Sequence, residues 1–96
     1  MIEIRETEAY AVWFAGLRDE RVRARVQARI RRLSLGNPGD VAPVGEGVSE
    51  MRIHYGPGYR VYFVQRGETL AILLGGGDKA SQDRDIRRAI ELAREV

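Results

Sequence analysis

Two arginines, a histidine and a tyrosine lie close together in a stretch of alternating polar and apolar residues: Arg52, His54, Arg60 and Tyr62. An arginine stays charged at any working pH and presents a planar fork of donors to phosphate oxygens, so Arg52 and Arg60 are suited to holding a phosphodiester. Cleavage of RNA without a metal also needs a base for the ribose 2′-hydroxyl and an acid for the leaving 5′-oxygen. His54 and Tyr62 are the proton carriers available nearby.

A simpler interpretation of the two proton carriers stays open. A single histidine on the polar side of a strand is more often a surface residue than a catalytic one. Tyr62 could pack against Ala71 with its hydroxyl in water. The chemical interpretation therefore depends on which side chains the fold brings together.

The turn at Gly56-Pro57-Gly58 predicts how these side chains meet. A hairpin that pairs Tyr55 with Tyr59 gives one apolar face and one polar face. The pairs expected on the polar face are Glu50 with Val64, Arg52 with Tyr62, and His54 with Arg60.

A second turn, at Arg66-Gly67, predicts a third strand that pairs Phe63 with Leu70 and extends the apolar face. The other face of that strand would carry Thr69, Ala71 and Leu73. Because none of these is a carboxylate, we expect the site to remain cationic.

The periodicity of the N-terminal half predicts a strand and two helices. Alternation over residues 2–5 indicates a short strand. Helical spacing follows from Thr7 to Leu17 and again from Asp19 or Glu20 to about residue 35, so the two helices form an antiparallel hairpin.

The C-terminal half is predicted to form three strands and one helix. A loop extends to about Gly47, the three-stranded segment ends at Gly75-Gly76-Gly77, and the last helix is capped by Ser81 or Asp78. The order strand, helix, helix, three strands, helix is of the α+β class, with a mostly antiparallel sheet packed against the helical hairpin.

Further cations flank this hairpin. Lys79 follows the glycines, which let the chain turn sharply and deliver it to the end of the sheet; the spacing of a phosphate-binding P-loop is absent. The second helix carries an arginine run that is either a solvated face or a contact for RNA phosphates or an acidic protein. Its candidate RNA-binding residues are Arg21, Arg25, Arg29 and Arg32.

Composition limits the possible functions. A chain of 96 residues is expected to form one domain, residues 1–96. It has no cysteine and one histidine, so neither a disulfide nor a metal site is expected, and we predict no cofactor. The net charge of +2 points weakly to an anionic partner. No signal peptide or membrane span is evident, which predicts a cytoplasmic protein.

Three segments stand out together: Gly47–Ile53, Gly58–Phe63, and Leu73–Lys79 followed by Gln82, Asp85 and Ile86. They resemble the addiction module killer protein branch of the RelE/ParE superfamily, close to the HigB-type toxins. The resemblance extends over nearly the whole chain.

This resemblance implies a RelE-like fold and the toxin of a type II toxin–antitoxin system. Such toxins cut messenger RNA, usually on the translating ribosome, and a co-expressed protein antitoxin neutralises them. A HigA-like antitoxin with a helix-turn-helix domain is expected. Arg60 matches the strand arginine that acts on the scissile phosphate. Arg52 takes the basic position of the preceding strand, and Lys79 falls where a basic residue often follows the last strand.

The sequence also departs from the family pattern. RelE-type toxins usually carry several lysines on the middle strand and a catalytic tyrosine or histidine near the C-terminus, whereas neither residue type follows Lys79 here. Tyr62 or His54 could act instead, and Gln82 or Asp85 could orient the substrate. The alternatives are a gyrase inhibitor of the ParE kind and a protein-binding module without activity.

Overall fold

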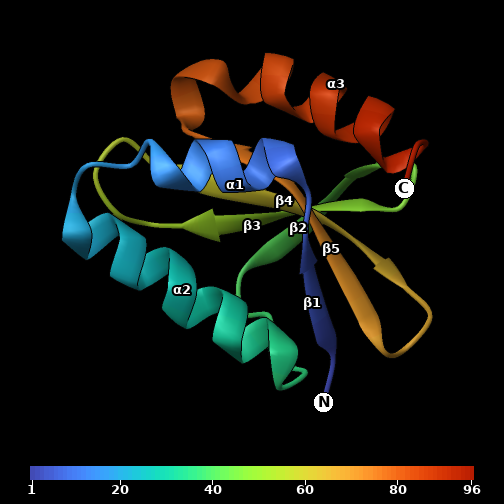
Figure 1. The fold of residues 1–96 in the computed structure, drawn as a ribbon. Coiled ribbons are helices and arrows are strands. Elements are labelled where there is room, and N and C mark those ends of the chain that lie inside the picture. The colour runs from blue at the N-terminus through green and yellow to red at the C-terminus, as the bar shows by residue number, and fades with distance from the viewer.

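Five strands form a single sheet in the computed structural model, which describes residues 1–96. Across the sheet the order is β1 (Glu3–Glu6), β5 (Leu70–Gly77), β4 (Tyr59–Arg66), β3 (Val48–Ile53) and β2 (Val41–Gly45). Only β1 and β5 run in parallel, and the other neighbours are antiparallel. The predicted α+β class with a mostly antiparallel sheet is confirmed (Figure 1).

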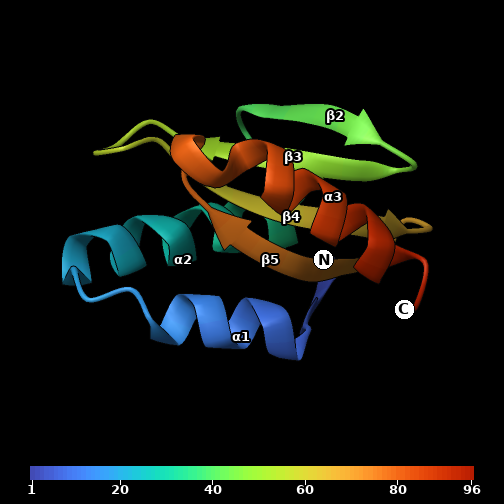
Figure 2. The ribbon, with the colours of Figure 1, turned by 90° about the horizontal axis from the view of Figure 1, so that it is seen from above.

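The helices cover both faces of the sheet. They are α1 (Glu8–Ala15), α2 (Glu20–Ser34) and α3 (Gln82–Ala93), the last preceded by a 3-10 turn at Lys79–Ser81. Figure 1 shows α2 and α3 on opposite sides of the sheet. In Figure 2, α1 lies beside β5, where the short β1 has ended. None of the helices has the length and apolar composition needed to cross a membrane.

Two hydrophobic clusters result from this arrangement, one on each face. Val22, Val26 and Leu33 of α2 pack with Met51, Val61 and Phe63 on one side. Ala89 and Ala93 of α3 pack with Val48, Tyr62, Val64 and Leu74 on the other. Beyond the predicted helical hairpin, therefore, the last helix closes the second face.

The N-terminal elements follow the predictions closely. The Thr7 side chain accepts a hydrogen bond from the Tyr10 backbone at 3.2 Å and so caps α1, while its hydroxyl donates to the Leu73 carbonyl at 2.8 Å. Asp19 caps α2 through the Arg21 backbone N–H at 2.8 Å. These caps fix where each helix begins.

The predicted loop up to Gly47 is wrong in part, because it contains the strand β2. This strand pairs with β3 and forms one edge of the sheet. Pro43 lacks a backbone donor and is tolerated there because an edge strand needs partners on one side only. A five-residue strand with a proline offers too little alternation to be recognised from sequence.

The predicted register between β3 and β4 is wrong by two residues. Arg52 pairs with Arg60, and Glu50 pairs with Tyr62. The turn is longer than expected, and Gly56 and Gly58 supply its positive φ angles of 55° and 80°. Because side chains alternate with a period of two, a shift of two changes the partners but keeps every side chain on its predicted face.

The predicted register between β4 and β5 is wrong by an odd number. Arg66 pairs with Leu70, Phe63 pairs with Leu73, and a bulge follows at Tyr62. The faces of β5 are therefore exchanged. Ala71 and Leu73 lie in the cluster under α2, and Ile72 and Leu74 lie beside Tyr62 under α3. Hydrophobicity could not settle this register because all four of these β5 residues are buried.

Candidate functional site

Three cationic side chains lie around one end of the sheet. Arg52 and Arg60 are direct cross-strand partners on β3 and β4. Arg60 also donates to the Gly58 carbonyl at 2.5 Å. The backbone N–H of Lys79 donates to the Pro57 carbonyl at 3.4 Å, which holds the start of the 3-10 turn against the β3–β4 turn. The Arg52 side chain is 42% exposed and that of Arg60 is 14% exposed.

A buried carboxylate, Glu50, lies among these cations. It is 1% exposed. Its Oε1 lies 3.1 Å from Arg52 Nε and 3.6 Å from Arg60 Nε, and its Oε2 accepts a hydrogen bond from Gln82 Nε2 at 2.8 Å. The expectation that the site remains cationic without a neutralising carboxylate is therefore wrong, because Glu50 shares a face of β3 with Arg52 and the register shift brings it beside Arg60.

Tyr62 lies beneath α3 and is fully buried, with a hydroxyl that makes no hydrogen bond. Burial raises its pKa well above the usual range, and the negative charges of Glu50 and Asp85 raise it further. The phenol therefore keeps its proton near neutral pH. This environment suits a packing residue or a proton donor and disfavours a general base.

His54 lies outside the strands and pairs with an acid on the β2 side. Its Nε2 lies 2.6 Å from Asp40 Oδ2, and its side chain is 77% exposed. The predicted pairing of His54 with Arg60 is wrong, since β3 ends before His54. Arg52 approaches the same carboxylate, with Nη1 3.9 Å from Asp40 Oδ1.

The His54 pair gives a pH-dependent prediction. The hydrogen bond from His54, aided by nearby positive charges, holds the pKa of Asp40 below its usual range. The pair therefore stabilises the fold above the ordinary carboxyl pKa, and this contribution is lost as pH falls through the depressed value. Replacing His54 by alanine should raise the Asp40 pKa, measured by carboxyl NMR titration. The matched variant His54→Gln keeps a donor and should shift the pKa less; equal shifts in both would contradict the assignment.

All residues of the candidate site lie within a segment that matches a known protein family. Residues 12–96 match the family described as phage-derived protein Gp49-like (DUF891), a match that begins within α1 and includes every strand except β1. The chain belongs to the Gp49-like family. Gp49-like proteins are toxin-type proteins of the RelE/ParE kind, so the resemblance to that superfamily is confirmed at this level. An uncharacterized protein of Haemophilus influenzae is 45% identical over 95 residues, which cover 99% of this chain and 96% of that protein.

The arginines of α2 in this Gp49-like chain differ in what they contact. Arg29 donates to the carbonyls of Arg52, Pro38 and Asp40 at 2.5, 3.0 and 3.2 Å, and so ties α2 to β3 and to the loop before β2. These bonds occupy its guanidinium with structural contacts. The helical spacing alone could not reveal this, since Arg29 belongs to the same run as its exposed neighbours.

The remaining candidates on α2 are more accessible. The Arg25 guanidinium lies 4.2 Å from the centre of the Tyr55 ring, a cation–π contact. Arg21 and Arg32 are exposed, and their side chains form no hydrogen bond or ion pair. Gln82 contacts Glu50 and is thereby joined to the arginine site.

The glycines of the Gp49-like chain allow close packing. Gly75, Gly76 and Gly77 belong to β5, so the predicted sharp turn at these residues is wrong. A Cβ at Gly76 would lie 2.5 Å from the Trp13 ring, and one at Gly77 would lie 1.9 Å from Asp85 Oδ2. Helices α1 and α3 can approach β5 closely because these side chains are absent.

Proposed function

We propose that this Gp49-like protein is the toxin of a type II toxin–antitoxin system and cuts messenger RNA at the Arg52–Arg60 site without a metal. The observation that supports this most directly is the cross-strand pairing of the two arginines, with Lys79 at the same end of the sheet. We propose that it acts on the translating ribosome, as HigB-type toxins do, and that a protein antitoxin neutralises it.

In this proposal the arginines hold the scissile phosphate. The ribose 2′-oxygen forms a bond to phosphorus, the bond to the 5′-oxygen breaks, and a cyclic phosphate remains. Arg60 and Arg52 stabilise the extra charge that develops on the phosphate oxygens, which supplies most of the rate. Lys79 is exposed and adds a third positive charge. The buried Glu50 holds both arginines in position through its ion pairs.

His54 is better placed than Tyr62 to accept the 2′-hydroxyl proton. Its imidazole is exposed, and the contact with Asp40 orients the ring, as a carboxylate orients a catalytic histidine. Asp40 lies within 3.9 Å of Arg52, so the pair belongs to the same surface. The leaving 5′-oxygen would take its proton from the protonated imidazole or from water.

Tyr62→Phe tests whether the Tyr62 hydroxyl takes part in catalysis or the ring serves only for packing. Because the Tyr62 hydroxyl is buried without a partner, Tyr62→Phe should keep growth inhibition and change the free energy of unfolding by less than about 1 kcal/mol. Growth assays and urea denaturation measure the two effects. Loss of growth inhibition in a variant of unchanged stability would instead assign Tyr62 a role in proton transfer.

Mapping RNA 5′ ends after a brief pulse of expression tests the proposed activity. New 5′ ends inside messenger RNAs should accumulate within minutes, and before growth stops. Intact messenger RNA together with a DNA damage response would instead indicate a gyrase inhibitor. Expression without any growth defect would indicate an inactive binding module.

Two observations favour the second candidate, inhibition of DNA gyrase in the manner of ParE. Glu50 pairs with both arginines and lowers the positive charge of the site. A protein that acts by binding needs no proton carrier, so the burial of Tyr62 would carry no cost for such a function.

A further inference from the structure

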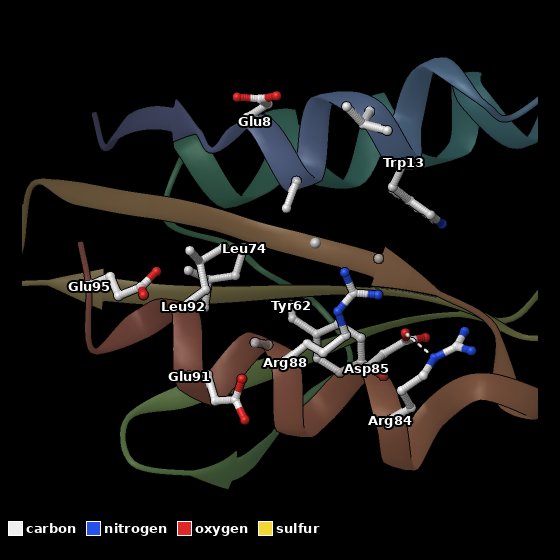
Figure 3. Close-up of a pocket in the computed structure, with 15 residues that line it drawn as sticks. Glu8, Trp13, Tyr62, Leu74, Arg84, Asp85, Arg88, Glu91, Leu92 and Glu95 are labelled. Carbon is white, nitrogen blue, oxygen red and sulfur yellow. Dashed lines mark ion pairs between the residues drawn. The ribbon is translucent and has the colours of Figure 1, made fainter.

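A groove of about 660 Å³ runs between α1 and α3 above the end of β5 (Figure 3). Arg52, Arg60 and Lys79 do not line it, whereas the buried Tyr62 does. Its base consists of apolar side chains and bare backbone, contributed by Trp13 of α1, Leu74, Gly75 and Gly76 of β5, and Leu92 of α3.

Two features of the groove leave apolar surface open to a partner. Val12 of α1 lines the groove and is 66% exposed. A Cβ placed on Gly75 would meet no atom within 4 Å, so the strand backbone is open to close approach there. Exposed apolar surface of this kind is typical of a binding groove.

Opposite charges gather at the two ends of the groove, as Figure 3 shows. Glu8, Glu91 and Glu95 lie at one end, and Arg84 and Arg88 lie toward the other. Asp85, near the arginines, accepts a hydrogen bond from Ser81 at 2.5 Å. Carboxylates outnumber arginines along the groove, which disfavours a nucleic acid backbone. An apolar base with separated charges instead suits an amphipathic helix.

We propose that this groove binds an amphipathic helix of the antitoxin, with basic residues over Glu8, Glu91 and Glu95 and acidic residues over Arg84 and Arg88. The partner's identity as an antitoxin rests on the proposed toxin function. Acidic residues in the first turn and basic residues in the last turn stabilise a helix through its dipole, so the bound helix runs parallel to α3, with its first turn over Arg84 and Arg88. Arg84 to Ala93 spans about 14 Å along α3, which matches two to three turns of helix.

Trp13 is the only tryptophan in the chain and lines the groove, so its fluorescence reports binding. The probe is a synthetic peptide of about 14 residues, without aromatic residues, that has leucines at helical spacing, glutamates in its first turn and lysines in its last. We expect a saturable blue shift of Trp13 emission. No saturable change, or the same change with a single-stranded RNA oligonucleotide, would overturn the proposal.

Two matched comparisons locate the bound peptide. Val12→Lys should weaken binding at least about tenfold. Leu35→Lys places the same charge on another exposed apolar residue, outside the groove, and should leave binding unchanged. Glu91→Lys should weaken binding, and a peptide with glutamates in place of its lysines should restore it. Equal effects of Val12→Lys and Leu35→Lys, or no restoration, would contradict the assigned groove.

Failure of the proposed groove can be distinguished from failure of the proposed toxin activity. Peptide binding without RNA cleavage or growth inhibition by the natural chain would leave the groove in place and remove the toxin function. RNA cleavage without peptide binding would do the reverse.

Discussion

An Arg60→Ala chain is expected to lose growth inhibition, with messenger RNA cleavage reduced at least about a hundredfold. Arg60 is the less exposed of the two paired arginines, and two contacts hold it in place: its donation to the Gly58 carbonyl and its ion pair with Glu50. Stabilisation of charge on phosphorus depends on donors that are already fixed in place, so removal of this one should act mainly on the chemical step. Growth curves and quantified RNA 5′ ends measure the loss.

Two controls accompany this variant. Arg94→Ala removes an arginine that also pairs with a glutamate, Glu46 at 2.6 Å, but lies elsewhere on the surface, and it should stay toxic. Circular dichroism must show that Arg60→Ala is folded. Arg60→Lys keeps the charge without the planar fork and should retain an intermediate activity. A folded Arg60→Ala chain with full toxicity would refute the assignment of Arg60 to the phosphate.

The largest expected loss of stability comes from Glu50→Ala, about 3 kcal/mol in the free energy of unfolding. Removing a buried carboxylate leaves Arg52, Arg60 and Gln82 without their shared partner. The partial exposure of Arg52 places the expected loss at the lower end of the range for buried pairs. Urea denaturation, followed by circular dichroism, measures it.

Matched variants separate burial from charge. Glu50→Gln keeps the shape and one acceptor, and should lose less than Glu50→Ala. Glu46→Ala removes a carboxylate of an exposed ion pair and should lower the free energy of unfolding far less than Glu50→Ala does. If Glu50→Ala were as stable as the natural chain, the buried cluster would have no structural role.

The sequence predicted the face of each side chain correctly on β3 and β4, where polar and apolar residues alternate. The polar face that contains Arg52, Arg60 and Tyr62 was predicted because the shift of two residues preserves alternation. The partners were wrong because the length of a glycine-rich turn cannot be derived from its residue types alone. On β5 even the face was wrong, since helices cover both sides and both sides are apolar.

The part of Glu50 in the site was missed for a related reason. A single glutamate in a strand is usually exposed, and its burial depends on α3, whose Gln82 is 32 residues away in sequence. Arg29 illustrates the same difficulty, because the carbonyls that it binds belong to β3 and to the loop before β2. Contacts between distant segments of this kind leave no periodic signal in the chain.

The hydrogen bond between Gln82 and Glu50 links α3 to the two arginines. A partner that displaces α3 by a small amount would change the position of Glu50, and with it the spacing of the arginines. For the proposed toxin, an antitoxin bound to α3 would then inhibit without covering the arginines. By thermodynamic reciprocity, an anion bound between the arginines would change the affinity for such a partner by the same factor.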